Sequence, residues 1–239
     1  MKTINLLQLY PRDMNIYGDM GNLLVLQKRL ERYGYTVNNL AYNPGDDFPK
    51  DVDLIVGGGG QDSGQSKIQT DLVVIGPKLI ELANSDVPML VICGMYQLFG
   101  NFFITSDGQT IEGIGLFDTE TRAGSERLIG NIITKSSKFG EIVGYENHSG
   151  QTTLGKHVEP LGRVLLGAGN NSSDDTEGAI CRNVIGTYLH GALLPKNPAI
   201  ADWLITQAIA RKFGKFEPKN EIDDSLADLA RQSAMKRPR

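Results

Sequence analysis

The chain has 239 residues, of which 40% are hydrophobic and 22% are charged, and its net charge is −4. This length and composition suit one sizeable α/β domain with at most a short appendage. The acidic balance, without a long basic stripe, argues against a nucleic-acid partner. No apolar run approaches the roughly 18 residues that suggest a membrane span. The two cysteines give no disulfide framework and the first residues lack a signal-peptide pattern, so we expect a reduced, cytoplasmic location.

The first part of the chain alternates between strand-like and helix-like segments. Apolar runs predict strands over residues 4–10, 35–40, 53–56 and 87–92, and apolar periodicity predicts helices over 23–30 and 69–83. Pro77 lies inside the second helical segment and predicts a kink or a division into two helices. Residues 15–22 form a polar, glycine-punctuated loop of functional appearance. The alternation predicts a mainly parallel central sheet with flanking helices.

The middle of the chain has a different pattern. Short strand-like runs, which predict antiparallel β-structure added to the parallel sheet, occur at residues 128–134, 142–145 and 163–166. Residues 167–178 are rich in Gly, Asn, Ser and Asp and predict a loop.

A further apolar strand over residues 184–189 leads into His190, and an amphipathic helix is predicted over 197–213. We expect one domain over residues 1–214. A linker and a short amphipathic tail with a frayed basic end follow over 215–239.

The candidate nucleophile is Cys93. An apolar strand ends at this cysteine, Gly94 follows directly, and a helical segment begins. A strand that delivers a nucleophile into a sharp strand-to-helix turn has this pattern. The positive end of the helix dipole favours a thiolate there. Many cysteines are only small buried side chains, and Cys181, which lacks such a setting, is interpreted in that way.

Four glycines, Gly57–Gly60, follow the predicted strand over 53–56. Such a run presents backbone N–H groups without side chains in the way, although by itself it favours a flexible turn. No Gly-Lys-Ser/Thr sequence follows, which excludes a phosphate-binding loop of the Walker type. The run and Cys93 both lie at carboxyl ends of predicted parallel strands, where ligands bind in such sheets.

His190 is the natural general base, because it alone among three histidines ends an apolar strand and precedes a glycine. His157 lies in a polar loop and is interpreted as solvated. His148, within the sequence Tyr-Glu-Asn-His-Ser-Gly, is ambiguous.

Together, residues 91–97 and 186–191 resemble class I glutamine amidotransferases, especially the cobyric acid synthase branch. A narrower resemblance is to the glutaminase subunits of lipid II isoglutaminyl synthases. It is carried by residues 15–22, 57–60, 126–131 and 146–150. The resemblance covers residues 3–214. It implies the mainly parallel α/β fold of that family, with the antiparallel additions, and it makes residues 1–214 a glutaminase domain.

The resemblance implies a reaction and a set of site residues. The thiolate of Cys93 attacks the side-chain amide of glutamine, His190 moves the proton, and ammonia leaves a γ-glutamyl thioester. The amides of Gly94 and Gly58 are expected to form the oxyanion hole. Gln97 is expected to hold the substrate, and Arg127 to bind its α-carboxylate, with Arg122 as the rival arginine.

Two positions depart from the common family pattern. Val91 and Met95 stand where the family has glycines around the nucleophile, although Gly94 still relieves the turn. Ala192 stands where an acid would orient the histidine. Cys93 and His190 are therefore predicted to form a dyad, with the acid supplied by a partner subunit and weak activity in the isolated chain.

The absence of a Walker-type loop places ATP chemistry elsewhere. The resemblance implies a heterodimer with a Mur-ligase-like synthetase that holds ATP and Mg²⁺ and acts on lipid II, while this chain needs no cofactor and no metal. Three alternatives stay open at this point. They are a cobyrinate-type glutaminase, a cysteine hydrolase of related fold acting on a peptide or other amide, and a non-catalytic binding subunit.

Overall fold

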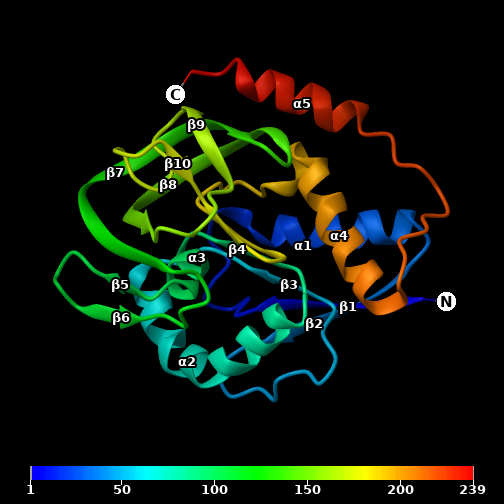
Figure 1. The fold of residues 1–239 in the computed structure, drawn as a ribbon, viewed down its shortest axis with the longest axis horizontal. Helices are drawn as coiled ribbons and strands as arrows, with labels where there is room; N and C mark the ends of the chain where they lie inside the picture. The colour runs from blue at the N-terminus through cyan, green and yellow to red at the C-terminus, as the bar shows by residue number, and fades with distance from the viewer. Residues whose placement is uncertain (1, 239) are drawn as a thin grey trace.

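The computed structural model describes residues 2–238, which contain two sheets flanked by helices (Figure 1). The first sheet has the strand order β11-β12-β4-β3-β1-β2. Its strands are β1 (Thr3–Leu9), β2 (Thr36–Tyr42), β3 (Leu54–Gly57), β4 (Met89–Ile92), β11 (Ala179–Cys181) and β12 (Val184–Thr187). All neighbouring pairs are parallel except β11 with β12, so the carboxyl ends of β3, β4 and β12 meet at one edge.

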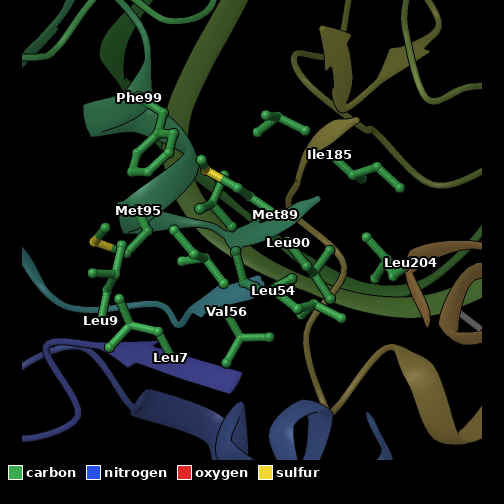
Figure 2. Packing of buried hydrophobic residues seen from close by; sticks show 14 of the residues in the cluster. Leu7, Leu9, Leu54, Val56, Met89, Leu90, Met95, Phe99, Ile185 and Leu204 are labelled. Atoms are coloured by element: carbon green, nitrogen blue, oxygen red, sulfur yellow. The ribbon is translucent and has the colours of Figure 1, made fainter. Parts of the chain in front are cut away.

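Helices cover both faces of this sheet. On one face α1 (Met20–Arg32) packs against α4 (Pro198–Phe213), and on the other lies α2 (Asp62–Asn84) with the short α3 (Gly94–Phe99) beside it (Figure 1). Two 3-10 turns precede α1 and α4, at η1 (Ile16–Gly18) and η2 (Leu194–Lys196). Figure 2 shows apolar side chains of β1, β3, β4 and α3 packed into one core. This burial fixes the strand ends on which the site is built.

The second sheet is mostly antiparallel. Its strands are β5 (Phe102–Ile104), β6 (Thr110–Glu112), β7 (Thr119–Ser136), β8 (Gly140–Leu154), β9 (Gly162–Leu166) and β10 (Thr176–Glu177). The long β7–β8 pair dominates it. The pairing register shifts between Ala123 and Leu128, which leaves Gly124–Arg127 in a bulge opposite a single residue of β8. Bulges of this kind re-aim side chains beside active sites.

The C-terminal tail is fastened to the domain. Its helix α5 (Ser225–Met235) runs along the second sheet and contacts β7 and β8 (Figure 1). The Arg29 guanidinium on α1 forms ion pairs with Asp202 and with Asp224, at 2.6 Å each, and Arg29 is itself buried. Phe216 packs edge-on against Tyr33. The boundary expected at residues 214 and 215 stays a prediction.

The predicted α/β fold, mainly parallel with antiparallel additions, is confirmed. Two details of the prediction were wrong. Residues 62–84 form one helix, which begins before the predicted 69–83 segment and continues through Pro77. Its first two turns carry few apolar residues, so periodicity could not reveal them. The strands β7 and β8 extend well beyond the predicted runs at 128–134 and 142–145, because their remaining residues are largely polar although several are buried.

Candidate active site

Cys93 sits in a sharp turn between β4 and α3. Its backbone has φ 50° and ψ −106°, and its N–H donates a hydrogen bond to the Thr187 carbonyl oxygen of β12 at 2.8 Å. A non-glycine residue in such a conformation costs about 1–3 kcal/mol, and strain of this kind clusters at functional sites. The side chain is 7% exposed and lines a cavity of about 440 Å³. The cysteine is thus held at the surface of a pocket by a strained elbow.

Gly94 is required at this elbow because its surroundings leave no room for a side chain. A Cβ there would lie 2.9 Å from Met14 Cε and 3.1 Å from the Gly60 amide nitrogen. The neighbouring Val91 and Met95 are fully buried in the core. The turn is therefore accommodated by the one glycine after the nucleophile, without glycines at the two positions where the common family pattern has them.

The structure places Gly60, and not Gly58, on the wall of the cavity. A Cβ on Gly58 would lie 2.5 Å from the Met14 carbonyl oxygen, so this glycine faces the N-terminal loop. The Gly59 N–H donates to Asp19 Oδ2 at 2.7 Å and is occupied. The oxyanion-hole role expected of Gly58 stays a prediction, and Gly60, which lines the cavity near Gly94, is the rival glycine.

His190 is buried beneath the ring of Tyr17, which contacts it edge-on with ring centroids 5.0 Å apart. His190 Nδ1 lies 3.4 Å from both carboxylate oxygens of Asp19, and both side chains are 1% exposed. The other ring nitrogen, Nε2, has no hydrogen-bond partner among the described residues. The prediction that this chain holds a dyad with no acid is therefore wrong, since Asp19 faces the histidine from the loop before α1.

The charges around His190 favour its protonated form. Burial by itself would lower the pKa of His190, but the negative charge of Cys93 and the contact with Asp19 outweigh burial and raise the pKa to about 10.

Gln97 and Arg127 line the same cavity as Cys93. Gln97 is buried, accepts a hydrogen bond from Gln65 at 2.9 Å and donates to the Tyr188 hydroxyl at 3.1 Å. Arg127 lies at the end of the β7 bulge and is exposed. Its Nε donates to Asn147 Oδ1 at 2.6 Å, and its Nη2 to the Tyr17 hydroxyl at 3.3 Å.

Arg122, the rival arginine, is not on the cavity wall. It lies 3.6 Å from Glu120 and packs over the ring of Phe102. The structure therefore favours Arg127 as the cation that meets a ligand in this pocket.

His148 also lines the cavity and stacks on the ring of Tyr188, with centroids 3.6 Å apart. Its Nδ1 lies 2.7 Å from the Gly150 carbonyl oxygen, so Nδ1 carries the ring proton. Burial lowers the pKa of His148 to about 3. This histidine stays neutral near Cys93, and its position resolves the ambiguity left by its sequence.

A buried carboxyl group fastens the strand that leads to His190. Glu177 Oε1 accepts hydrogen bonds from the Thr187 hydroxyl at 2.9 Å and from the Tyr188 N–H at 2.8 Å. Burial raises the pKa of Glu177 to about 8, in spite of these two donors. Glu177 and Tyr188 had no sequence signal, whereas Tyr17 and Asp19 lie in the loop whose polar, glycine-punctuated composition was noted.

The fold and the elbow are those of class I glutamine amidotransferases. Residues 5–198 match the model of the CobB/CobQ-like glutamine amidotransferase domain, and the chain belongs to this family.

Two curated relatives match most of the chain. The lipid II isoglutaminyl synthase (glutamine-hydrolyzing) subunit GatD of Staphylococcus aureus N315 is 40% identical over 220 residues, which are 92% of this chain and 89% of that protein. GatD of Streptococcus pneumoniae R6 is 37% identical over 215 residues, or 89% of this chain and 83% of that protein. A probable cobyric acid synthase of Methanosphaera stadtmanae is 40% identical over 126 residues, which are 47% of this chain but 25% of that protein.

Solved structures share the fold at low sequence identity. PurLQS from Thermotoga maritima matches with a TM-score of 0.58 and 17% identity, covering 87% of this chain and 98% of that one. A glutamine amidotransferase from the same organism has a TM-score of 0.56 and 15% identity, covering 97% and 93%. These likenesses show the fold alone.

Within residues 2–238, no helix is both long and apolar enough to cross a membrane. The same residues hold no group of three or more His, Cys, Asp and Glu side chains placed to bind a metal ion.

Proposed function

We propose that this chain is the glutaminase subunit of a lipid II isoglutaminyl synthase, working in the cytoplasm. It hydrolyses glutamine through a thioester on Cys93 and supplies the ammonia to a Mur-ligase-like synthetase subunit (MurT). That partner uses ATP and Mg²⁺ to amidate D-glutamate in the stem peptide of lipid II, a step of peptidoglycan biosynthesis. The observation that carries the glutaminase proposal is the strained Cys93 elbow, placed on a polar cavity beside the amides of Gly94 and Gly60.

The first half-reaction forms the thioester. The Cys93 sulfur attacks the side-chain amide carbon of glutamine, and the carbonyl oxygen becomes an oxyanion near the Gly94 and Gly60 N–H groups. The imidazolium of His190 gives its proton to the amide nitrogen, the C–N bond breaks, and neutral ammonia leaves.

The second half-reaction releases glutamate. Acylation removes the negative charge of Cys93, and that charge is one of the groups that keep His190 protonated. The ring is then neutral and takes a proton from water as the water oxygen attacks the thioester carbon. The C–S bond breaks, the thiolate is restored, and glutamate leaves. The raised pKa of His190 thus serves the first half-reaction and falls when the second begins.

Residues on both sides of the cavity supply the substrate contacts. The planar guanidinium of Arg127 suits a bidentate contact with the α-carboxylate of glutamine. Gln97 lies at the same wall as Cys93, with its amide fixed by Gln65 and the Tyr188 hydroxyl. The neutral His148 adds a wall residue that cannot donate a second proton to departing ammonia at neutral pH.

The separate partner is supported by the extent of the matches and by the names of the relatives. Both GatD relatives are described as subunits, and each is matched over most of its length. The sequence contains no Walker-type loop. Ammonia protonates readily in bulk water, so the cavity is expected to open toward the partner.

The test measures glutamate released from glutamine by the chain alone and together with its Mur-ligase-like partner. The parent is compared with Cys93→Ala, and Cys181→Ala serves as the matched cysteine control. We expect release that needs Cys93 and not Cys181. If the partnered parent releases no glutamate, the glutaminase proposal is wrong.

A cobyrinate-type amidotransferase is the second candidate, because one cobyric acid synthase is 40% identical over 126 residues. The acceptor decides between the two. Amide formation on lipid II supports the first proposal, and amide formation on a cobyrinate with no reaction on lipid II replaces it with the second.

A further inference from the structure

We propose that Asp19 is the positioning residue of this site, and that it orients His190 and the Gly57–Gly60 loop at the same time. This inference rests on the proposed glutaminase function. It replaces the expectation that a partner subunit must supply the acid.

The carboxylate of Asp19 has contacts on both sides. Each oxygen lies 3.4 Å from His190 Nδ1, and Oδ2 also accepts the Gly59 N–H at 2.7 Å. Gly59 is held between the two side chains. A Cβ on it would lie 2.7 Å from His190 Cε1 and 3.2 Å from Asp19 Oδ2. The carboxylate of Asp19 therefore holds His190 and the glycine loop at a fixed separation. The residue after Gly59 in that loop is Gly60, and its amide lies beside Gly94.

The side chain of Asp19 does not cap the helix that follows it. Asp19 occupies the N-cap position of α1, where an aspartate ordinarily accepts a hydrogen bond from the first N–H groups of the helix. Here it makes no such bond. Asn15 Oδ1 accepts the Met20 N–H at 2.8 Å instead. The helix end is satisfied by another residue, so the Asp19 carboxylate is available to His190.

The packing of α1 also explains why the acid does not follow the histidine in sequence. A Cβ on Gly21 would lie 2.7 Å from Ala192 Cβ, so the first turn of α1 lies directly against residue 192. One residue further along α1, Asn22 Oδ1 accepts the Leu194 N–H at 3.0 Å. A longer side chain at position 192 would meet α1. The small pair Gly21 and Ala192 lets α1 approach closely enough for Asp19 to reach the ring from the other side.

The chemical consequence is a fixed tautomer. A carboxylate facing Nδ1 keeps the proton on that nitrogen and leaves the Nε2 lone pair for the thiol of Cys93. It also stabilises the imidazolium that forms when the thiol ionises. Asparagine has nearly the same shape but no charge, and its amide can present a donor to Nδ1 and favour the wrong tautomer.

The main experiment compares Asp19→Asn with the parent in a Cys181→Ser background, where Cys93 is the only thiol. The rate of alkylation by iodoacetamide is measured against pH, and glutamate release is measured with and without the partner. Asp13→Asn is the matched control, because Asp13 lies in the same part of the chain but pairs with the exposed Lys67. Circular dichroism checks that each variant is folded.

We expect Asp19→Asn to lower kcat by about 10²–10⁴-fold with little change in KM. We also expect it to move the midpoint of Cys93 alkylation upward by at least about one pH unit, whereas Asp13→Asn leaves both unchanged. A merely structural role would not shift the alkylation midpoint in a folded variant. An unchanged midpoint, or parental kcat restored by the partner, overturns the proposal.

A second measurement needs no change at Asp19 and so does not depend on that variant folding. In Cys93→Ser, nitrogen NMR of the three histidines reports the His190 tautomer directly. We expect the neutral ring to carry its proton on Nδ1, and a proton on Nε2 would contradict the role of Asp19. The alkylation midpoint and the tautomer do not require turnover. They therefore test Asp19 even if the partnered parent releases no glutamate and the proposed function fails.

Discussion

The two walls of the cavity differ in how firmly they are built. The wall from the first sheet holds Cys93, with His190 buried behind it under Tyr17, and both residues are nearly inaccessible to solvent. The wall from the second sheet holds Arg127, which is exposed and emerges from a bulge. In the proposed mechanism the reacting groups are thus fixed before substrate arrives, while the arginine proposed to bind the α-carboxylate is free to adjust.

Backbone strain is distributed in the same way. Tyr17, Cys93 and Ala192 all have positive φ, and all three surround the first wall. Within the β7–β8 pair, the described non-glycine residues have no such values. Strained residues cost about 1–3 kcal/mol each and persist only where their surroundings determine them strongly. The strained residues of the first wall are therefore held in place by the packing of the rest of the fold. The β7–β8 pair needs no such support.

The largest effect should come from the first wall. Cys93→Ala removes the nucleophile and should lower glutamate release by at least about 10³-fold, because the other groups cannot form a thioester. Steady-state release with the partner present is the measurement. A Cys93→Ala protein that still releases glutamate at a comparable rate would mean that the first wall does not carry the chemistry.

The second wall should affect binding more than chemistry. Arg127→Ala should raise the KM for glutamine by about 10–100-fold, the range expected for losing hydrogen bonds to a charged group, with a smaller effect on kcat. Arg122→Ala is the control, since Arg122 lies off the cavity wall. A mainly kcat effect for Arg127→Ala would show that the two walls do not divide the work.

Tyr17 joins the two walls, because its ring covers His190 and its hydroxyl accepts from Arg127. Tyr17→Phe removes only the hydroxyl and should raise KM by about 10-fold, the lower end of the range for a hydrogen bond to a charged group, since this one is exposed. Tyr17→Gly removes the ring but also relieves the positive φ of 58°, so its melting temperature should fall little while kcat falls. A large loss of stability in the glycine variant would contradict strain at this residue.

The smallest expected effect concerns the buried carboxyl that fastens β12. The pKa of Glu177 is raised from 4.5 to about 8 in the folded chain. Between these values the folded state keeps a proton that the unfolded state releases, so stability should decline as pH rises from about 4.5 to about 8. Thermal melts of the parent and Glu177→Gln across that range provide the check. The melting temperature of the variant should decline less steeply with pH. Equal slopes for the two proteins would show that Glu177 does not cause the pH dependence.

The sequence predicted the parts of the site that depend on local pattern. Cys93 and Gly94 stand in a strand–glycine–helix pattern, and His190 follows an apolar strand, so each could be located from its neighbours alone. Asp19 could not be assigned to His190, because the two are 171 positions apart and meet only when the start of α1 packs against the turn after β12. Gly58 and Gly60 belong to a run of identical residues, and only the path of the loop around Asp19 distinguishes them.

The elbow at Cys93 also sets an order of assembly. Its N–H is held by Thr187 of β12, which reaches β4 only after a long intervening stretch of chain has been made. Closing so long a loop is an entropic cost that must be met before the contact forms. A growing or truncated chain that lacks β12 therefore carries an unremarkable thiol at position 93. Only when β12 has joined the sheet does His190 come to face Cys93, so the two proposed catalytic groups meet only in the finished protein.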